Sequence, residues 1–234
     1  MDVVTDLVRV WIIPCDVPPE ILARCTEVLD DGERTRAAAF LTARDRHQFV
    51  IAHGALRILA GRGLNTPAEA LTWIPGEHGK PELSPPWSDL RTSLSHSGSL
   101  IAVATSAHRS VGVDIQHLMP AMDTIALSAR FFPPDEALYV GAASDACTRA
   151  DRFARLWARK EAVVKAAGGR LWPNLRIEVR DRQIVSCAEP ASTYRIADVP
   201  APPGFRAAVA LAGTVTFGVE VARWPDENTE SAMA

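Results

Sequence analysis

The order of predicted helices and strands limits the fold of this chain most strongly, because the same order occurs twice. Helix-type apolar spacing and capping signals predict helices at 20–29, 33–40, 43–63, 125–132, 135–140 and 150–167. β-Rich apolar runs predict strands at 7–13, 71–74, 92–94, 100–105, 111–115, 175–179, 194–196, 205–211 and 215–221. Helices followed by strands in each half indicate an α+β fold rather than an alternating parallel sheet.

The change from strands back to helices near residue 117 predicts two similar lobes, each with helices packed on a small, mainly antiparallel sheet. We expect an N-terminal lobe at 1–116, a C-terminal lobe at 117–224 and a polar, disordered tail at 225–234. No residue-level repeat accompanies the similar order of elements. The short segment 107–110 suits a hairpin between its two neighbouring strands.

Charge and cysteine usage narrow the class of protein. The 25 basic and 28 acidic side chains give a formal charge of -3, which does not suit binding of bulk nucleic acid or an anionic membrane. Four cysteines are scattered without a C-x-x-C pair, as in reduced intracellular proteins. No apolar run approaches the roughly 20 residues of a membrane helix, and the acidic start lacks a basic signal region. We therefore expect a cytoplasmic monomer with no nucleic-acid or membrane partner.

Lysine is rare in this chain. Of the 25 basic residues, only Lys80, Lys160 and Lys165 are lysines. Arginine fills the other basic positions, so a retained lysine suggests a need for a compact, strongly hydrated ammonium group. Chance retention in a small sample is the alternative. The neighbours of each lysine decide between the two.

The helix at 150–167 carries two of these lysines. Wrapped at about 100° per residue, it places Lys160 near the middle of an apolar arc, so its ammonium must either extend to solvent or meet an anion. Glu161 lies at the edge of the arc, with Lys165 one turn further along. The alternative is an ordinary amphipathic helix with an exposed ion pair between Glu161 and Lys165.

Two oxygen-bearing side chains share one face of the strand at 111–115. Asp114 and Gln116 are two residues apart, and strand side chains repeat every two residues. A carboxylate and an amide oxygen form half of a site for Mg²⁺, which prefers carboxylates, waters and substrate phosphate oxygens. The alternative is an aspartate that ends the strand in a turn.

The loop-rich region at 75–99 contains two further candidate segments. The segment 93–98 reads as a hydroxyl-rich loop around His96, which offers hydroxyl, imidazole and backbone N–H donors to a phosphate. The segment 78–81 places Lys80 between Gly79 and Pro81. Each segment alone is equally compatible with a plain turn.

Taken together and in this order, Gly-Lys-Pro, Leu-Ser-His-Ser, Gly-Val-Asp-Ile and Trp-x-x-Lys-Glu-Ala-x-x-Lys resemble the 4'-phosphopantetheinyl transferase family. The resemblance is to its larger, two-lobed Sfp-type members, and the Trp157 and Ala162 spelling is that of the W/KEA branch. It extends from the helix bearing His47 and Arg57 to the end of the Lys165 helix, roughly half of the chain.

The resemblance implies transfer of 4'-phosphopantetheine from coenzyme A to a serine of an apo acyl, peptidyl or polyketide carrier protein, with release of adenosine 3',5'-bisphosphate. The active site would lie between the lobes, with Glu161 and Lys165 as catalytic residues. Asp114, Gln116 and Glu161 would bind Mg²⁺, with Mn²⁺ as a substitute. The coenzyme A pocket would be formed by Arg57, Gly79, Lys80, Pro81, Ser95, His96, Lys160 and Lys165. Arg34 or Arg36 would assist Arg57 near the 3'-phosphate.

One residue departs from the family pattern. Many relatives carry a second acid where this chain has Gln116, and an amide adds no negative charge and cannot act as a base. Two other functions therefore stay open. The acids and lysine also suit a metal-dependent phosphodiester hydrolase, and the missing acid suits a non-catalytic module that binds coenzyme A or a carrier protein.

Overall fold

The computed structural model describes residues 6–76, 80–169, 175–187 and 192–225. The helices are α1 Pro19–Glu27, α2 Asp31–Ala38, α3 Ala43–Leu64, α4 Thr124–Phe131, α5 Pro134–Gly141 and α6 Ala146–Ala167, with a short 3₁₀ turn, η1, at Ala68–Ala70. The strands of the first half are β1 Asp6–Pro14, β2 Trp73–Pro75, β3 Pro81–Leu83, β4 Leu90–Ser97, β5 Leu100–Ala107 and β6 Val111–His117. Those of the second half are β7 Ile184–Cys187, β8 Ser192–Val199, β9 Phe205–Ala212 and β10 Phe217–Arg223.

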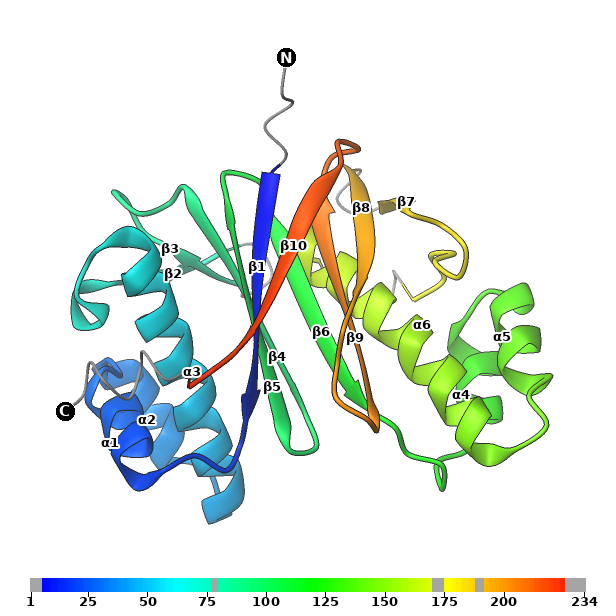
Figure 1. Ribbon diagram of the computed structural model, residues 1–234, viewed down its shortest axis with the longest axis horizontal. Helices are drawn as coiled ribbons and strands as arrows, with labels where there is room; N and C mark the ends of the chain where they lie inside the picture. Colours follow the sequence, from blue (N-terminus) through cyan, green and yellow to red (C-terminus); the bar gives the residue numbers. More distant parts are fainter. Residues whose placement is uncertain (1–5, 77–79, 170–174, 188–191, 226–234) are drawn as a thin grey trace.

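Two four-stranded sheets form the centre of the molecule, in the orders β10-β1-β5-β4 and β6-β9-β8-β7. Neighbouring strands are antiparallel except for β1 and β10, which are parallel. Helix α3 lies on the first sheet with α1 and α2 packed against it, and α6 lies on the second sheet with α4 and α5 packed against its outer side (Figure 1). The predicted α+β fold with two similar lobes is therefore confirmed.

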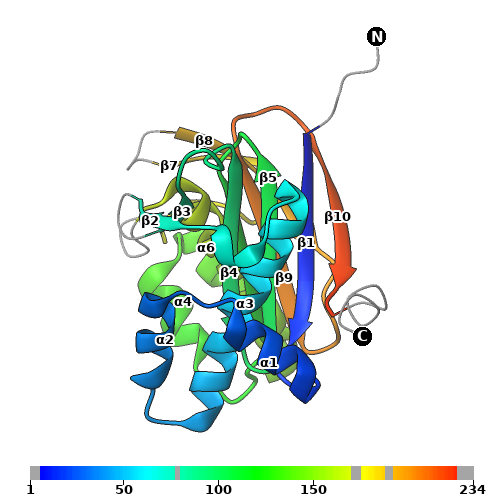
Figure 2. The same ribbon diagram turned by 90° about the vertical axis from the view of Figure 1, so that its left-hand side faces the viewer.

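The strand pairing does not follow the predicted division of the chain at residue 117. β6 precedes that point but pairs with β9 in the second sheet (Figure 1). β10 follows it but pairs with β1 in the first sheet (Figure 2). The lobe boundaries stay a prediction. The predicted hairpin around 107–110 is wrong, because β5 pairs with β4 and β1 while β6 begins the other sheet. Of the predicted tail at 225–234, all residues after Pro225 lie outside the described residues.

The two sheets are held together by apolar side chains between them. Val8, Val10 and Ala104 from the first sheet share one core with Val111, Val113, Val209 and others from the second. Separate cores lie beneath the helices of each lobe. Because both faces of each sheet are covered, the strands read as nearly continuous apolar runs, which is why the sequence predicted most of them.

Capping side chains begin the two 22-residue helices. The Thr42 side chain accepts a hydrogen bond from the backbone N–H of Asp45 at the start of α3, as its spacing predicted. Asp145 does the same for Thr148 at the start of α6. At its end, α6 has Gly168 in the left-handed conformation, with φ of 64°. Within the described residues, no helix is both long and apolar enough to cross a membrane.

Two local predictions were wrong. The strand predicted at 175–179 is irregular backbone, although Leu175 and Val179 are buried. The segment predicted as a Ser-rich loop at 93–98 is instead mostly strand, because β4 runs eight residues from Leu90 to Ser97. Its small hydroxyl side chains resemble a turn by composition, but they alternate with the period of two residues that a strand requires.

Candidate active site

The helix α6 lies directly on the strand β6, and a glycine makes this approach possible. A Cβ atom added at Gly112 would lie 2.0 Å from the carbonyl oxygen of Ala162 and 2.4 Å from the backbone nitrogen of Ala166. Only a residue without a side chain fits there. The close contact brings Asp114 of β6 beside Glu161 and Lys165 of α6.

Replacing Gly112 by alanine is expected to lower the free energy of unfolding by about 3 kcal/mol, because strand and helix backbones would have to separate. Urea denaturation measures this loss. The matched control is Gly218→Ala in strand β10, where an added Cβ would make an ordinary contact of 3.4 Å with Leu7. Equal stability changes in the two variants would show that the close approach at Gly112 is not required.

Asp114 is the most highly connected acid of this site. Its side chain is only 2% exposed, and it accepts three hydrogen bonds. On Oδ1, the donors are Ser95 Oγ and Lys165 Nζ, both at 2.6 Å. On Oδ2, the donor is Gln116 Nε2 at 2.8 Å. Asp114 therefore lies inside a strand in a charged cluster, and the alternative of a strand-ending turn residue is excluded.

Glu161 is the second acid. Burial and the nearby negative charge of Asp114 raise the pKa of Glu161 to about 7, against the opposing effects of Lys165 and a hydrogen bond from Trp157. The influence of Asp114 means that the two carboxylates from separate halves of the chain are neighbours. A carboxyl group with a pKa near neutrality can hold and release a proton under physiological conditions.

These residues fit a divalent cation that has oxygen ligands. Among the described residues, no three His, Cys, Asp or Glu side chains gather into a complete metal site. Two carboxylates are nevertheless what Mg²⁺ commonly takes from a protein when waters and substrate phosphates complete its shell. Gln116 presents its Nε2 to Asp114, so its oxygen does not face that carboxylate. Gln116 thus contacts Asp114 through its donor group, and its place among the metal ligands stays a prediction.

A cavity of about 370 Å³ opens beside this cluster, between α6, β4 and the helices of the first lobe. Lys80, Lys165 and Arg36 contribute cationic side chains to its wall, and Ser93 contributes a hydroxyl group. A second cavity of about 350 Å³ shares Arg36 and His53 with the first. Its wall also includes His96, Gln48 and Asp45. The cationic walls suit a ligand with several negative charges.

Lys80 lines the larger cavity together with Pro81, and their contact with coenzyme A stays a prediction. Its Nζ donates hydrogen bonds to the carbonyl oxygen of Val111 at 2.8 Å and to Ser110 Oγ at 3.4 Å. Burial lowers the pKa of Lys80 to about 8, an effect that Glu82 opposes and Arg91 reinforces. Gly79 lies outside the described residues.

The side chains of Ser95 and His96 lie on opposite faces of β4, as those of successive strand residues must. Ser95 is buried and contacts Asp114, while His96 lines the second cavity. Burial and the positive charge of Lys165 lower the pKa of His96, so its imidazole is neutral over more of the physiological range. His96 therefore remains a candidate ligand residue, whereas Ser95 does not line either cavity.

Lys160 is not in the cavity, and its assignment to coenzyme A binding was wrong. Its side chain is fully buried in the second lobe, where Nζ lies 2.6 Å from Glu136 Oε2 and donates to the carbonyl oxygen of Ile177. It also lies over the ring of Phe132, 4.8 Å from the centroid. The anion that a lysine on this apolar arc must meet is therefore a side chain of the protein.

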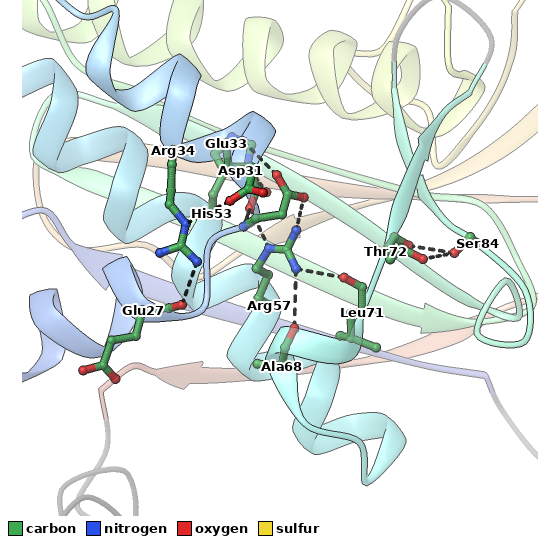
Figure 3. Close-up of polar contacts among 11 residues, drawn as sticks. Glu27, Asp31, Glu33, Arg34, His53, Arg57, Ala68, Leu71, Thr72 and Ser84 are labelled. Carbon is green, nitrogen blue, oxygen red and sulfur yellow. Dashed lines mark hydrogen bonds and ion pairs between the residues drawn. The ribbon is translucent and has the colours of Figure 1, made fainter.

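The donor groups of Arg57 are also occupied by partners within the protein. It is 1% exposed and forms ion pairs with Asp30 and Glu33, and it donates to the carbonyl oxygens of Leu71 and Ala68 (Figure 3). With these donors occupied, the assignment of Arg57 to a ligand phosphate was wrong. Arg36, which the sequence suggested only as an assistant, lines both cavities instead.

His53 is a cavity residue that the sequence did not reveal. It lines both cavities, its Nδ1 lies 3.1 Å from Glu33 Oε1, and its ring stacks on Phe49. His53 lies one helical turn before Arg57, so both side chains reach Glu33 (Figure 3). The four-residue spacing of His53 and Arg57 was the only hint in the sequence. It points to Glu33 as their common partner only once α2 is known to pack against α3.

The fold and the site together define a two-lobed α+β protein with paired carboxylates and lysines beside a cationic cavity, as phosphoryl-group transfer requires. The profile of the 4'-phosphopantetheinyl transferase superfamily matches residues 110–200. The chain is 31% identical to the 4'-phosphopantetheinyl transferase HetI of Nostoc sp. over 170 residues, which cover 72% of this chain and 71% of that protein. The chain therefore belongs to the 4'-phosphopantetheinyl transferase family, and it is an enzyme.

Two more distant relatives have the same activity in their names. The chain is 36% identical over 124 residues to the 4'-phosphopantetheinyl transferase AcpT of Escherichia coli strain K12, covering 52% of this chain and 63% of AcpT. It is 29% identical over 136 residues to the 4'-phosphopantetheinyl transferase of Bacillus subtilis, covering 58% of each protein. These two matches span less than two thirds of either relative. The Sfp-type, W/KEA assignment stays a prediction.

Proposed function

We propose that this enzyme transfers 4'-phosphopantetheine from coenzyme A to a serine hydroxyl of an apo carrier protein and releases adenosine 3',5'-bisphosphate. The observation that carries the proposal is the cluster of Asp114, Glu161 and Lys165 beside a cavity whose wall includes Lys80. The serine oxygen forms a bond to the phosphorus next to pantetheine, and the bond from that phosphorus to the adenosine-bearing phosphate breaks.

In this proposal the acids hold a metal ion and the lysines hold the diphosphate. Asp114 and Glu161 would hold Mg²⁺ or Mn²⁺, and the ion would neutralise phosphate charge and make the bisphosphate a better leaving group. Lys165 is 28% exposed on the cavity wall, so it can contact a diphosphate oxygen while it remains near Asp114. Lys80 binds the diphosphate from the opposite lobe. Both lysines then act by positioning and charge neutralisation.

Glu161 accepts the serine proton in this scheme. Its pKa is about 7 without a metal ion, and a cation bound beside it would lower that value, so Glu161 would be ionised and able to take the proton directly or through a metal-bound water. Gln116 cannot take this role because an amide has no basic oxygen. Arg36 and His96 bind the nucleotide end of coenzyme A, with Arg36 in the place that the sequence had assigned to Arg57.

The decisive experiment is a transfer assay that is read by mass spectrometry. The protein is mixed with coenzyme A, Mg²⁺ and apo acyl, peptidyl or polyketide carrier proteins, and a mass gain of about 340 Da marks the transferred group. Binding of coenzyme A without an adduct on any carrier would favour the non-catalytic module. Metal-dependent cleavage of DNA or RNA that Asp114→Ala abolishes would favour the phosphodiester hydrolase. Relative rates on the carriers rank them as substrates.

Coenzyme A affinity is expected to fall as the pH rises above about 8, since free Lys80 loses its proton there and must regain it to bind an anion. Calorimetric titrations between about pH 7 and pH 9.5 measure this dependence. Lys80→Arg keeps its charge throughout this range, so its affinity should change less with pH. An identical pH dependence in wild type and variant would contradict the role of Lys80.

The remaining features of the proposal concern location and assembly. We propose a cytoplasmic monomer that has no nucleic-acid or membrane partner, on the basis of its charge and cysteine usage. Size-exclusion chromatography with light scattering tests the oligomeric state. A dimer at micromolar concentration would contradict this part of the proposal without affecting the reaction.

A further inference from the structure

The edges of the two four-stranded sheets meet at β4 and β6, and serine side chains join them. β4 carries a serine at every second position: Ser93, Ser95 and Ser97. Their Oγ atoms accept hydrogen bonds from the backbone N–H groups of Val113 at 3.0 Å, Ile115 at 3.4 Å and His117 at 3.0 Å. Both series advance by two residues in the same direction. These contacts form a regular set of three rungs, which we call the serine ladder.

Serine suits this ladder for a chemical reason. A buried N–H group on the edge of a sheet needs an acceptor, and a hydroxyl oxygen provides one close to the strand that carries it. The hydroxyl also keeps a proton that it can donate elsewhere. Alanine would leave the N–H group of β6 without its partner.

Ser95 differs from the other two serines of the ladder. Its rung is the longest, and its hydroxyl donates to Asp114 Oδ1 at 2.6 Å. Ser93 and Ser97 make the same kind of backbone contact, but neither contacts a carboxylate within the described part of the chain. The middle rung therefore has a second partner that the outer rungs lack.

The contacts of Asp114 show what this second partner does. An ionised carboxylate has about four acceptor positions, two on each oxygen. Ser95 and Lys165 occupy those of Oδ1, and Gln116 occupies one on Oδ2. The position that remains for a metal ion is on Oδ2. Rotation of the carboxylate would move this position. The short, buried hydrogen bond from the Ser95 hydroxyl opposes such rotation.

We propose that Ser95 is a positioning residue that orients Asp114 for metal binding, while Ser97 only joins the two sheets. Ser93 joins the sheets and also lines the larger cavity. This inference rests on the proposed function, because it takes Asp114 to be a metal ligand. It changes the role of Ser95 from a coenzyme A contact to a support of the acid next to it. Such outer contacts commonly alter metal affinity 10- to 100-fold.

The test compares Ser95→Ala with Ser97→Ala, since each variant of the full chain removes one rung of the ladder. Mn²⁺ affinity is measured by electron paramagnetic resonance in the presence of coenzyme A and without carrier protein. Coenzyme A affinity is measured separately by calorimetry with the metal removed. For Ser95→Ala we expect Mn²⁺ binding to weaken about 10- to 100-fold while metal-free coenzyme A affinity is unchanged. Ser97→Ala, whose side chain lines neither cavity, should change neither quantity.

Three results would overturn the inference. They are an unchanged Mn²⁺ affinity in Ser95→Ala, an equal loss in Ser97→Ala, and a fall of metal-free coenzyme A affinity in Ser95→Ala. If Ser95→Ala does not fold, Ser95→Cys keeps a similar size with a weaker donor, and it should also weaken Mn²⁺ binding. The proposed function fails in a different way, namely when wild-type protein binds Mn²⁺ but forms no carrier adduct.

Discussion

Replacement of Asp114 by asparagine is expected to lower kcat/KM for phosphopantetheine transfer by about 10³-fold or more, which corresponds to about 4 kcal/mol of transition-state stabilisation. Asparagine has nearly the same shape but no charge, so the proposed metal ion loses a carboxylate ligand. Lys165 also loses the anion that holds its Nζ at 2.6 Å. Initial rates of adduct formation, measured by mass spectrometry at saturating carrier protein, quantify the loss.

The matched control for this variant is Asp198→Asn. Asp198 forms ion pairs with Arg155 and Arg159 of α6, but it does not contact the acidic cluster. The Asp198→Asn variant therefore removes a negative charge beside α6 without altering the acidic cluster, and transfer should continue. Circular dichroism shows whether both variants are folded. Activity of Asp114→Asn close to that of the wild type would refute the metal role of this residue.

Lys160→Met is expected to destabilise the fold by about 3–5 kcal/mol, because it leaves the Glu136 carboxylate buried without its cation. Glu136 is 2% exposed and also accepts hydrogen bonds from the backbone N–H groups of Val179 and Arg180. The ion pair thereby connects α5, α6 and the irregular segment around Val179. Urea denaturation at neutral pH measures the change in the free energy of unfolding.

A second substitution separates the buried charge from other effects of Lys160→Met. In the double variant with Glu136→Gln, the amide oxygen still accepts the two backbone hydrogen bonds, so much of the lost stability should return. As a surface control, Arg182→Met removes an exposed ion pair with Glu178 and should cost less than about 1 kcal/mol. At temperatures where Lys160→Met is folded, its KM for coenzyme A should equal that of the wild type. A raised KM would return Lys160 to the binding site.

Local pattern was enough to predict most of the helices and strands. Apolar periodicity revealed α3 and α6, and Thr42 was recognised as the residue that caps α3. The same reasoning failed for β4, whose serines resemble a turn by composition although they serve as acceptors for β6. It also failed for 175–179, where buried residues form no strand. In both cases the partner that decides the structure is distant in the sequence.

The candidate site acids and the two buried cations, Lys160 and Arg57, illustrate the same division. Asp114 was identifiable as a site residue because a carboxylate inside an apolar strand needs a special partner. The sequence could not show that Lys160 and Arg57 already have such partners. Both reach carboxylates more than 20 residues away, Lys160 through Glu136 and Arg57 through Asp30 and Glu33.

The sequence by itself determined the α+β class, the family and the acids and lysines that such chemistry needs, because these follow from residue types and short-range spacing. Only the tertiary structure decided which charged side chains remain free for a ligand. Charges in a folded protein are neutralised by whichever groups the packing brings near, and that packing joins β6 to α6 and to β4 across the two sheets.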